Sequence, residues 1–461
     1  MRTERLAMQI QFLGATGTVT GSKYLVTSES STIMVDCGLF QGYKQLRLRN
    51  REVFPVAPAS IDAVVLSHAH LDHSGYLPVL VANGFTGRIY CTQATFELCK
   101  VLLPDSARLL EEEAEYANRH GFSRHHPALP LYTEAQASKA LAHFTPVQLD
   151  QPFHPVGKVT ARLRHAGHIL GAATVTLDDG QTRITFSGDL GRPADAIIMP
   201  PAPPEDTDYL VIESTYGDRL HAHDTDPMAQ LAEIIRKTAS RGGAVIIPSF
   251  AVARTQTLIY MLYRLKQEGA IPANLPVYLN SPMAADVSAI YLRHIREHRI
   301  SEEACRAMFR SIHIVNSVDE SIALNLQRMP MVIIAGSGMA TGGRVLHHLK
   351  AFAPDPRNTI VFVGFQAGGT RGASMLAGAE SIKVHGAYIP VRADVVQIED
   401  LSAHADRAEI ISWLSKFKKA PKKTFITHGE PPAADALRLS IEEQLSWNCV
   451  VPDYLERFDL T

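Results

Sequence analysis

Short runs of β-branched and aromatic residues recur through the first part of the chain, and a turn containing glycine follows most of them. Alternation of this kind, bounded by turn residues, is typical of strands. We expect an antiparallel sheet with helices outside it, and one longer helix over residues 97–119. The runs that predict the strands are MQIQFLG, SKYLVTS, STIMVDCG, AVVLSHAH, RIYCT, VTARLRHAG, ATVTLDD and TRITFSGD.

The pattern changes after a proline-rich stretch, MPPAPP, at residues 199–204. Apolar runs then alternate with helical segments, such as residues 253–268, and this rhythm is typical of a parallel, doubly wound sheet. The β-runs YIPVRADVVQI and KTFITHG follow later in the chain and are too few to form a unit alone. We therefore expect residues 1–215 and 386–461 to form one domain, with residues 216–385 inserted as a second.

Composition excludes several classes of protein. Of the 461 residues, 46% are hydrophobic and 20% are charged, which excludes a largely disordered or fibrous chain. Because no apolar run could span a membrane and the first residues hold no signal-like apolar core, we expect a cytoplasmic protein without a membrane partner. The five cysteines lack CxxC spacing and predict neither disulfides nor a sulfur zinc site. Because the formal net charge is −2, any affinity for nucleic acid would have to come from a local groove rather than from the charge of the whole protein.

The strongest chemical signal is the hexad HAHLDH, which directly follows the run AVVLS. Its imidazole and carboxylate groups are ligands that zinc takes, and a loop entering a helix can direct them at two neighbouring metal positions. A single histidine is more often structural, but this grouping predicts a metal site. The ligands that the hexad offers are His68, His70, Asp72 and His73.

Further ligands are expected at the ends of later strands, because one hexad cannot complete two coordination spheres. Three residues follow β-runs in this way: His168 in RHAGH, Asp189 in FSGD and His428 in FITHGE. Asp189 is suited to bridge two ions because a carboxylate has two oxygens. Asp36, which ends STIMVD, could orient a ligand histidine through its other ring nitrogen. The alternative for Asp36 is a turn-forming aspartate.

In this order, Asp36, the hexad, His168 and Asp189 resemble the successive motifs of the metallo-β-lactamase superfamily. The chain also resembles the β-CASP group of nucleic-acid-processing nucleases, whose inserted domain is similar to the runs PSFAVARTQ, NSPM, SGMATGGR and GFQAGGTRG. The three motifs of that group are matched by Glu213 in IESTYG, His404 in SAHAD and His428 in THGE. The resemblance implies an α/β fold, an αββα metallo-β-lactamase sandwich with an inserted, doubly wound β-CASP domain.

The resemblance implies a dizinc ribonuclease in which a metal-bridging hydroxide attacks the phosphodiester and leaves 5′-phosphate and 3′-hydroxyl products. His404 would protonate the departing ribose oxygen, and Glu213 would fix the tautomer of His404. One zinc ion would be held by His68, His70 and His168, the other by Asp72, His73 and His428, with Asp189 bridging. The catalytic assignments are His404, Glu213, Asp72 and Asp36.

RNA-acting members of the group carry histidine at the third motif, so His428 favours single-stranded RNA as the substrate, with DNA as a secondary candidate. Open α/β sheets bind ligands at the carboxyl ends of their strands. Polar residues at those ends, and arginines near the starts of helices, are therefore candidate substrate contacts. They are Ser249, Arg254, Ser337, Arg344, Gln366 and Arg371. A plain strand-to-helix turn is the alternative for the segment of Arg344.

Two other functions stay open at this point. A small-molecule metallohydrolase acting on thioesters or lactams would share the metal ligands, but it has no use for a second domain or for the pair of Glu213 and His404. A catalytically weak RNA-binding subunit would carry a degenerate site, whereas all seven expected ligands are present. The mode of cleavage, from a 5′ end or internally, the natural RNA and any homo-oligomer are also left open.

Overall fold

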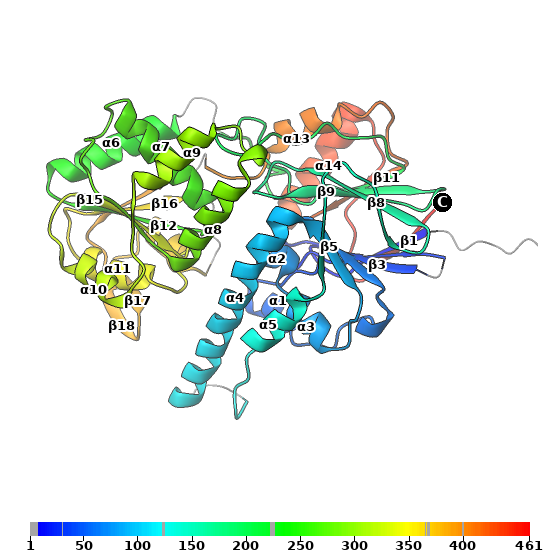
Figure 1. The fold of residues 1–461 in the computed structure, drawn as a ribbon, viewed down its shortest axis with the longest axis horizontal. Helices are drawn as coiled ribbons and strands as arrows, with labels where there is room; N and C mark the ends of the chain where they lie inside the picture. Colours follow the sequence, from blue (N-terminus) through cyan, green and yellow to red (C-terminus); the bar gives the residue numbers. More distant parts are fainter. Residues whose placement is uncertain are drawn as a thin grey trace, which may run out of the picture. The chain divides into compact units, whose positions relative to one another are not determined.

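The computed structural model describes residues 8–29, 31–121, 125–221, 226–364, 366, 369–398 and 401–461. Two compact units divide the chain. The first combines the segment up to Leu220 with His404–Thr461, and the second is His221–Ala403. Figure 1 draws the first unit in blue through teal and in orange to red, and the second in green to yellow.

The first sheet of the first unit is mixed. Its strands are β1 (Met8–Phe12), β2 (Tyr24–Ser28), β3 (Ser31–Val35), β4 (Ala63–Val65), β5 (Arg88–Thr92), β6 (Phe144–Val147) and β22 (Arg457–Leu460). In the described part of the chain the order is β22-β1-β2-β3-β4-β5-β6. The pairs from β22 to β3 are antiparallel, and those from β3 to β6 are parallel.

The second sheet is also mixed. Its strands are β7 (Phe153–Val156), β8 (Val159–His165), β9 (Ala173–Asp178), β10 (Arg183–Phe186), β11 (Tyr209–Glu213), β20 (Lys423–Thr427) and β21 (Cys449–Val450). The order is β21-β20-β11-β10-β9-β8-β7, antiparallel from β7 to β10 and parallel from β10 to β21. The expected sheet was therefore antiparallel only in part, because the β-runs predict strands but not their partners.

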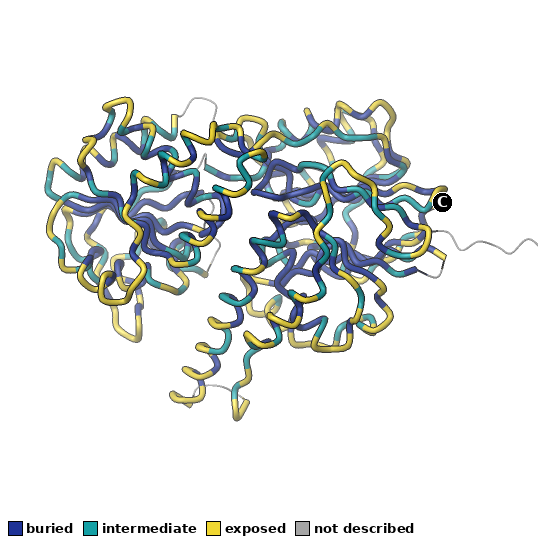
Figure 2. The backbone as a smooth tube through the Cα atoms, viewed as in Figure 1, coloured by how far each residue is buried: buried dark blue, intermediate teal, exposed yellow. Residues whose placement is uncertain are grey.

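The core of the first unit lies between these two sheets, whose inward residues are buried (Figure 2). Aromatic rings join the layers. Phe12 of the first sheet contacts Phe425 of the second with ring centroids 5.2 Å apart, and Tyr24 contacts Phe186 at 5.5 Å. Side chains from opposite sheets thus fill one interior, as two sheets packed face to face require.

Helices complete the sandwich on both sides. They are α1 (Lys44–Arg49), α2 (Leu71–Ser74), α3 (Leu77–Ala82), α4 (Gln93–His120), α5 (Glu134–Leu141), α13 (Arg407–Leu414) and α14 (Pro431–Leu445). α4 is the long helix expected over 97–119, and it contacts β5 and β6. On the second sheet, Trp413 of α13 and Leu437 of α14 pack against Leu210 of β11 in one apolar cluster. The αββα sandwich is confirmed.

The second unit is built on a sheet whose pairs are all parallel, as expected. Its strands are β12 (Ala244–Ser249), β13 (Val277–Asn280), β14 (His313–Ile314), β15 (Met331–Gly336), β16 (Thr359–Val363) and β19 (Asp394–Ile398), in the order β14-β13-β15-β12-β16-β19. A separate hairpin joins β17 (Ser381–Val384) to β18 (Ala387–Pro390).

The helices of the second unit are α6 (Pro227–Ser240), α7 (Arg254–Gln267), α8 (Pro282–Arg293), α9 (Glu302–Arg310), α10 (Val318–Leu326), α11 (Val345–Phe352) and α12 (Arg371–Leu376). The compact unit extends to Ala403, past the boundary expected after residue 385, because β19 pairs with β16 rather than with a strand of the first unit. Across the described ranges, no helix is long and apolar enough to cross a membrane.

Candidate metal centre

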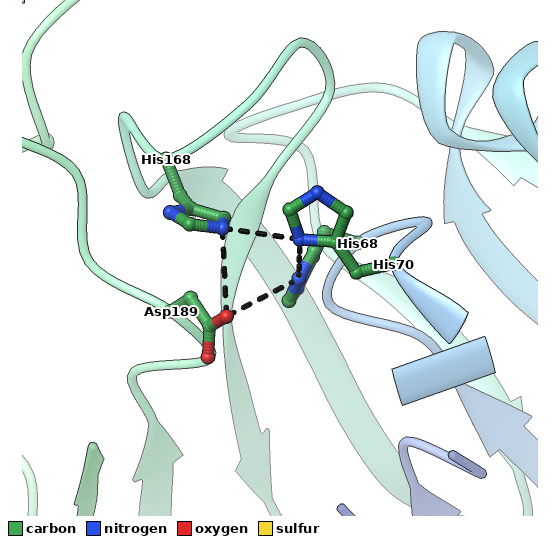
Figure 3. A group of neighbouring side chains, drawn as sticks. All are labelled: His68, His70, His168 and Asp189. Atoms are coloured by element: carbon green, nitrogen blue, oxygen red, sulfur yellow. Dashed lines mark hydrogen bonds and ion pairs between the residues drawn. The ribbon is translucent and has the colours of Figure 1, made fainter. Parts of the chain in front are cut away.

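A first group of four side chains converges where strands of the first unit end (Figure 3). His68 and His70 lie in the loop between β4 and α2, His168 in the loop after β8, and Asp189 in the loop after β10. His70 Nδ1 lies 3.2 Å from both His68 Nε2 and His168 Nε2. Asp189 Oδ2 lies 3.4 Å from His68 Nε2 and 3.5 Å from His168 Nε2. All four ligand atoms therefore face one point.

A second group contains Asp72, His73 and His428. The first two lie on α2, and His428 directly follows β20. His428 Nε2 lies 3.0 Å from His73 Nε2 and 3.5 Å from Asp72 Oδ2. The other oxygen of Asp189, Oδ1, is 3.2 Å from His73 Nε2. The two oxygens of Asp189 thus face different groups, as a bridging carboxylate requires.

These groups fit zinc. With zinc–ligand distances of about 2.0–2.1 Å, the edges of a tetrahedral site measure about 3.3 Å, and the spacings within the groups run from 3.0 to 3.5 Å. Asp189 Oδ1 is also buried without a hydrogen bond from any described residue. A buried carboxylate oxygen is costly unless a donor or a cation satisfies it. The donor set and this oxygen both suit a divalent cation.

The charge states of His68, His70 and Asp189 suit metal ligands as well. Burial lowers the pKa of His70 to about 4 and that of His68 well below its ordinary value, so these rings are neutral at pH 7. Burial also raises the pKa of Asp189, but the neighbouring histidines, His428 and His73 foremost, outweigh burial and hold it well below its usual range. Neutral imidazoles and an ionised carboxylate are the forms that bind a metal.

Asp36 lies behind the second group. Its Oδ2 is 2.7 Å from His73 Nδ1, and its carboxylate accepts hydrogen bonds from Ser67 N at 2.7 Å and Ser67 Oγ at 2.8 Å. Burial lowers the pKa of His73, but Asp189 and Asp36 outweigh burial and hold that pKa well above its ordinary value. Asp36 is thus placed to hold the ring with Nε2 toward the group, and the orienting role stays a prediction.

Next to the first group, His404 forms a pair with Glu213. His404 Nδ1 lies 3.1 Å from Glu213 Oε2 and 4.0 Å from Asp189 Oδ2. Glu213 also accepts a hydrogen bond from Leu190 N at 2.6 Å, which holds the carboxylate in place. Burial lowers the pKa of His404, but Glu213 outweighs it, so the pKa is raised. The His404 side chain is 18% exposed, whereas that of Glu213 is fully buried.

Three family descriptions match the chain. "Metallo-beta-lactamase superfamily" matches residues 16–249, "Beta-Casp domain" residues 255–375, and "Zn-dependent metallo-hydrolase RNA specificity domain" residues 388–452. The first match spans half of the chain and contains both groups of ligands except His428. The chain belongs to the metallo-β-lactamase superfamily, β-CASP group. The family that the sequence motifs resemble is therefore confirmed.

Named relatives agree with this family. The chain is 35% identical to "Ribonuclease TTHA0252" of Thermus thermophilus, over 92% of this chain and 93% of that protein. It is 30% identical to "Transcription termination factor FttA" of Methanocaldococcus jannaschii, over 95% of this chain and 70% of that protein. A solved structure, a protein of unknown function from Enterococcus faecalis V583, shares the fold with a TM-score of 0.56 at 14% identity and covers 98% of this chain and 99% of that one.

The second unit (His221–Ala403) contains the Beta-Casp match and is called the β-CASP unit from here on. The expected substrate contacts lie at the carboxyl edge of its sheet, and most form hydrogen bonds within the unit. Arg254 Nη1 donates to Val363 O at 3.0 Å. Arg344 donates to Asn280 Oδ1, Val315 O and Asn316 O, and Arg371 to Lys383 O, Ala340 O and Thr341 O. Ser249 Oγ donates to Phe250 O, and Ser337 Oγ is 2.9 Å from Thr341 Oγ1.

Gln366 differs from these five. It is 8% exposed, and neither atom of its amide forms a hydrogen bond with a described residue. A Cβ added to Gly372 would come within 2.0 Å of Gln366 Oε1, so any larger residue there would require the amide of Gln366 to shift. The substrate role of all six residues remains a prediction, and Gln366 is the one whose hydrogen-bonding capacity is unused within the described chain.

Sequence reasoning missed the hydroxyl groups around the ligand histidines. Ser67 Oγ lies 3.1 Å from His68 Nδ1, Ser22 Oγ lies 3.3 Å from His73 Nε2, and Thr215 Oγ1 lies 3.0 Å from His428 Nδ1. Serine and threonine are common in loops, so only their positions next to motif residues, Ser67 before the hexad and Thr215 inside IESTYG, could have singled them out.

Proposed function

We propose that this chain is a zinc-dependent ribonuclease that hydrolyses phosphodiester bonds of single-stranded RNA. The observation that carries the proposal is the hydrogen-bonded pair of His404 and Glu213, with His404 Nδ1 4.0 Å from the Asp189 carboxylate. A protonated histidine beside a metal centre supplies a proton to a poor leaving group, such as the ribose oxygen of an RNA strand. A thioester needs no such donor, because a thiolate leaves without a proton.

Each of the two groups of side chains would hold one zinc ion. His68, His70 and His168 would hold one zinc ion, Asp72, His73 and His428 the other, and Asp189 would contact both through its two oxygens. Zinc, when bound, supplies a water of lowered pKa as the nucleophile and positive charge against the phosphate. Asp36 would keep His73 Nε2 aimed at the centre by accepting a hydrogen bond from His73 Nδ1–H.

His404 would act as the general acid. Glu213 accepts a hydrogen bond from Nδ1–H of His404. The transferable proton of the imidazolium is therefore the one on the other ring nitrogen, Nε2. The raised pKa keeps this ring protonated to a higher pH than an ordinary histidine. Transfer of the proton to the departing 3′ oxygen would leave a 3′-hydroxyl on one product, and the phosphate would stay on the 5′ end of the other.

RNA as the substrate rests on the relatives and on His428. One relative is named a ribonuclease, and the third family description names RNA specificity. A small-molecule metallohydrolase would share the metal ligands but would leave the second unit and the His404–Glu213 pair without a role. A catalytically weak RNA-binding subunit is disfavoured because every ligand of both groups is present and converges.

The test is to incubate the zinc-loaded protein with one RNA sequence, labelled separately at each end, as a single strand and as a duplex. A chromogenic lactam and a thioester serve as competing substrates. We expect cleavage of the single strand with 5′-phosphate products, loss of cleavage after chelation and recovery with zinc. The order in which the two labels are released separates 5′ exonuclease from endonuclease action. Turnover of the lactam or thioester without RNA cleavage would contradict the proposal.

A further inference from the structure

The segment that follows β11 lies directly beside the proposed ligand His428. β11 and β20 pair in parallel register, with Glu213 opposite Thr427, so the residues after both strands lie side by side. Ser214 stabilises this arrangement with two hydrogen bonds: Ser214 Oγ donates to Thr427 O at 2.8 Å, and Ser214 N donates to His428 O at 3.3 Å. The position of the next residue, Thr215, is therefore set by the sheet.

Thr215 contacts His428 twice. Its Oγ1 lies 3.1 Å from His428 O and 3.0 Å from His428 Nδ1. A hydroxyl has one hydrogen and can also accept. When that hydrogen is donated to the carbonyl, the oxygen can only accept from Nδ1–H. This places the proton of the neutral imidazole on Nδ1 and leaves Nε2 with a free lone pair.

That lone pair is the one the second group needs. His428 Nε2 is the atom that faces His73 Nε2 at 3.0 Å and Asp72 Oδ2 at 3.5 Å. Asp189 Oδ1 also lies near His428 Nδ1, at 3.5 Å, which is long for a hydrogen bond. Because Thr215 Oγ1 accepts the hydrogen bond from His428 Nδ1–H at the shorter distance of 3.0 Å, Asp189 Oδ1 stays available to a cation.

We infer that Thr215 is a positioning residue for metal binding, which fixes the tautomer and the ring orientation of His428. The inference rests on the proposed metal centre, but not on RNA as the substrate. The second group then has an outer partner on each of its histidines: Asp36 on His73 and Thr215 on His428. Thr215 differs from Asp36 because its hydroxyl orients the ring without adding negative charge.

The experiment compares Thr215→Val, which keeps the shape and removes the hydroxyl, with Thr215→Ser, which keeps the hydroxyl. Thr185→Val is the matched control. Thr185 is a buried threonine of β10 that belongs to neither metal group, and its Oγ1 lies 3.1 Å from Thr176 Oγ1. Each protein is titrated with a zinc chelator of known affinity, and bound zinc is measured by elemental analysis. Thermal unfolding of the metal-free proteins reports on the fold separately.

We expect Thr215→Val to bind the more weakly held zinc ion about 10–100-fold less tightly, the usual effect of losing such a partner. Thr215→Ser and Thr185→Val should match the wild type, and the unfolding midpoints of the metal-free Thr215→Val and Thr185→Val proteins should fall by similar amounts. If Thr215→Val does not fold, Thr215→Ala takes its place, with the same expected loss of affinity.

Two results would overturn the inference. One is wild-type affinity for both ions in Thr215→Val; the other is weak zinc binding in Thr215→Ser as well, which would show that side-chain volume, not the hydroxyl, matters. A wild-type protein that holds fewer than two ions would instead contradict the proposed centre itself. Zinc affinity therefore separates failure of the Thr215 inference from failure of the proposed function.

Discussion

The carboxyl ends of strands carry polar side chains in both units, but these side chains do different things. In the first unit, which carries the metallo-β-lactamase fold, the residues after β4, β10 and β20 direct ring nitrogens and carboxylate oxygens at one another across 3.0–3.5 Å. In the β-CASP unit, Arg254 follows β12 and Arg344 follows β15, and both direct their guanidinium groups at main-chain oxygens. At this edge of the sheet, the side chains of the first unit form candidate metal-binding groups, whereas those of the second unit stabilise loops through hydrogen bonds.

The difference follows from hydrogen-bonding capacity. An imidazole nitrogen with a lone pair cannot bond to a second lone pair, so a cluster of such atoms is stable only with protons or a cation between them. A guanidinium has five N–H donors, and in the β-CASP unit these groups donate to carbonyl oxygens of other strand ends and loops. Unsatisfied acceptors therefore mark a binding site more reliably than charged donors do. If this contrast holds, substitutions in the two groups of the first unit should change zinc content and cleavage, whereas substitution of an arginine such as Arg344 should change stability.

Asp189→Asn should have the largest effect. The change removes the charge that both groups share, so the zinc content should fall below two equivalents, and RNA cleavage should fall by more than the ~10²–10⁴-fold that loss of a general acid costs. Elemental analysis and initial rates measure both. Asp178→Asn is the control, because Asp178 pairs with Arg183 at the surface, away from both groups. Retention of two ions and of full activity in Asp189→Asn would remove the basis for a shared carboxylate.

His404→Ala should lower the cleavage rate by ~10²–10⁴-fold, the usual contribution of general acid catalysis, and leave the zinc content at its wild-type value. An RNA with a bridging sulfur at the scissile linkage sharpens the test, since a thiolate leaves without a proton. The variant should recover most of its loss on that linkage. An equal defect on both linkages, or loss of zinc, would make His404 a ligand or a phosphate contact instead.

Glu213→Gln should have a smaller effect, which depends on pH. Glu213 raises the pKa of His404 against the effect of burial, so removing its charge lowers that pKa. The acid form of His404 is then lost at a lower pH, and the alkaline limb of the profile of kcat against pH should move to lower pH. Glu205→Gln, at a surface pair with Arg162, is the control. A profile unchanged from that of the wild type would argue against His404 as the acid.

Arg344→Ala should affect the fold of the β-CASP unit more than RNA binding. It removes hydrogen bonds to three oxygens, so the free energy of unfolding should fall by about 1–3 kcal/mol, measured by denaturant titration. The slope of log affinity for RNA against log salt should not change. A slope that falls by about one would identify Arg344 as a phosphate contact. Arg357→Ala, at an exposed pair with Asp355, is the control and should change little.

Much of the fold could be predicted from the chain, because each strand of both units carries its own local pattern. The alternation in MQIQF and the apolar run AVIIPS predict β1 and β12 without reference to their neighbours. Strand direction in the first unit and the domain boundary could not be predicted in this way. Whether residues 394–398 join β16 or a strand of the first unit depends on which apolar surface they bury, and that is decided far from them in sequence.

The types of the candidate ligands could be predicted from the chain alone, because the hexad spacing places His68, His70, Asp72 and His73 within one loop and one helical turn. The chain alone could not show which of these side chains face each other, which group each oxygen of Asp189 faces, or that the Thr215 hydroxyl lies beside His428. The physical reason is that hydrogen bonds and metal coordination act over about 2–3.5 Å. Residues such as Thr215 and His428, 213 positions apart, reach that distance only when β11 and β20 pair.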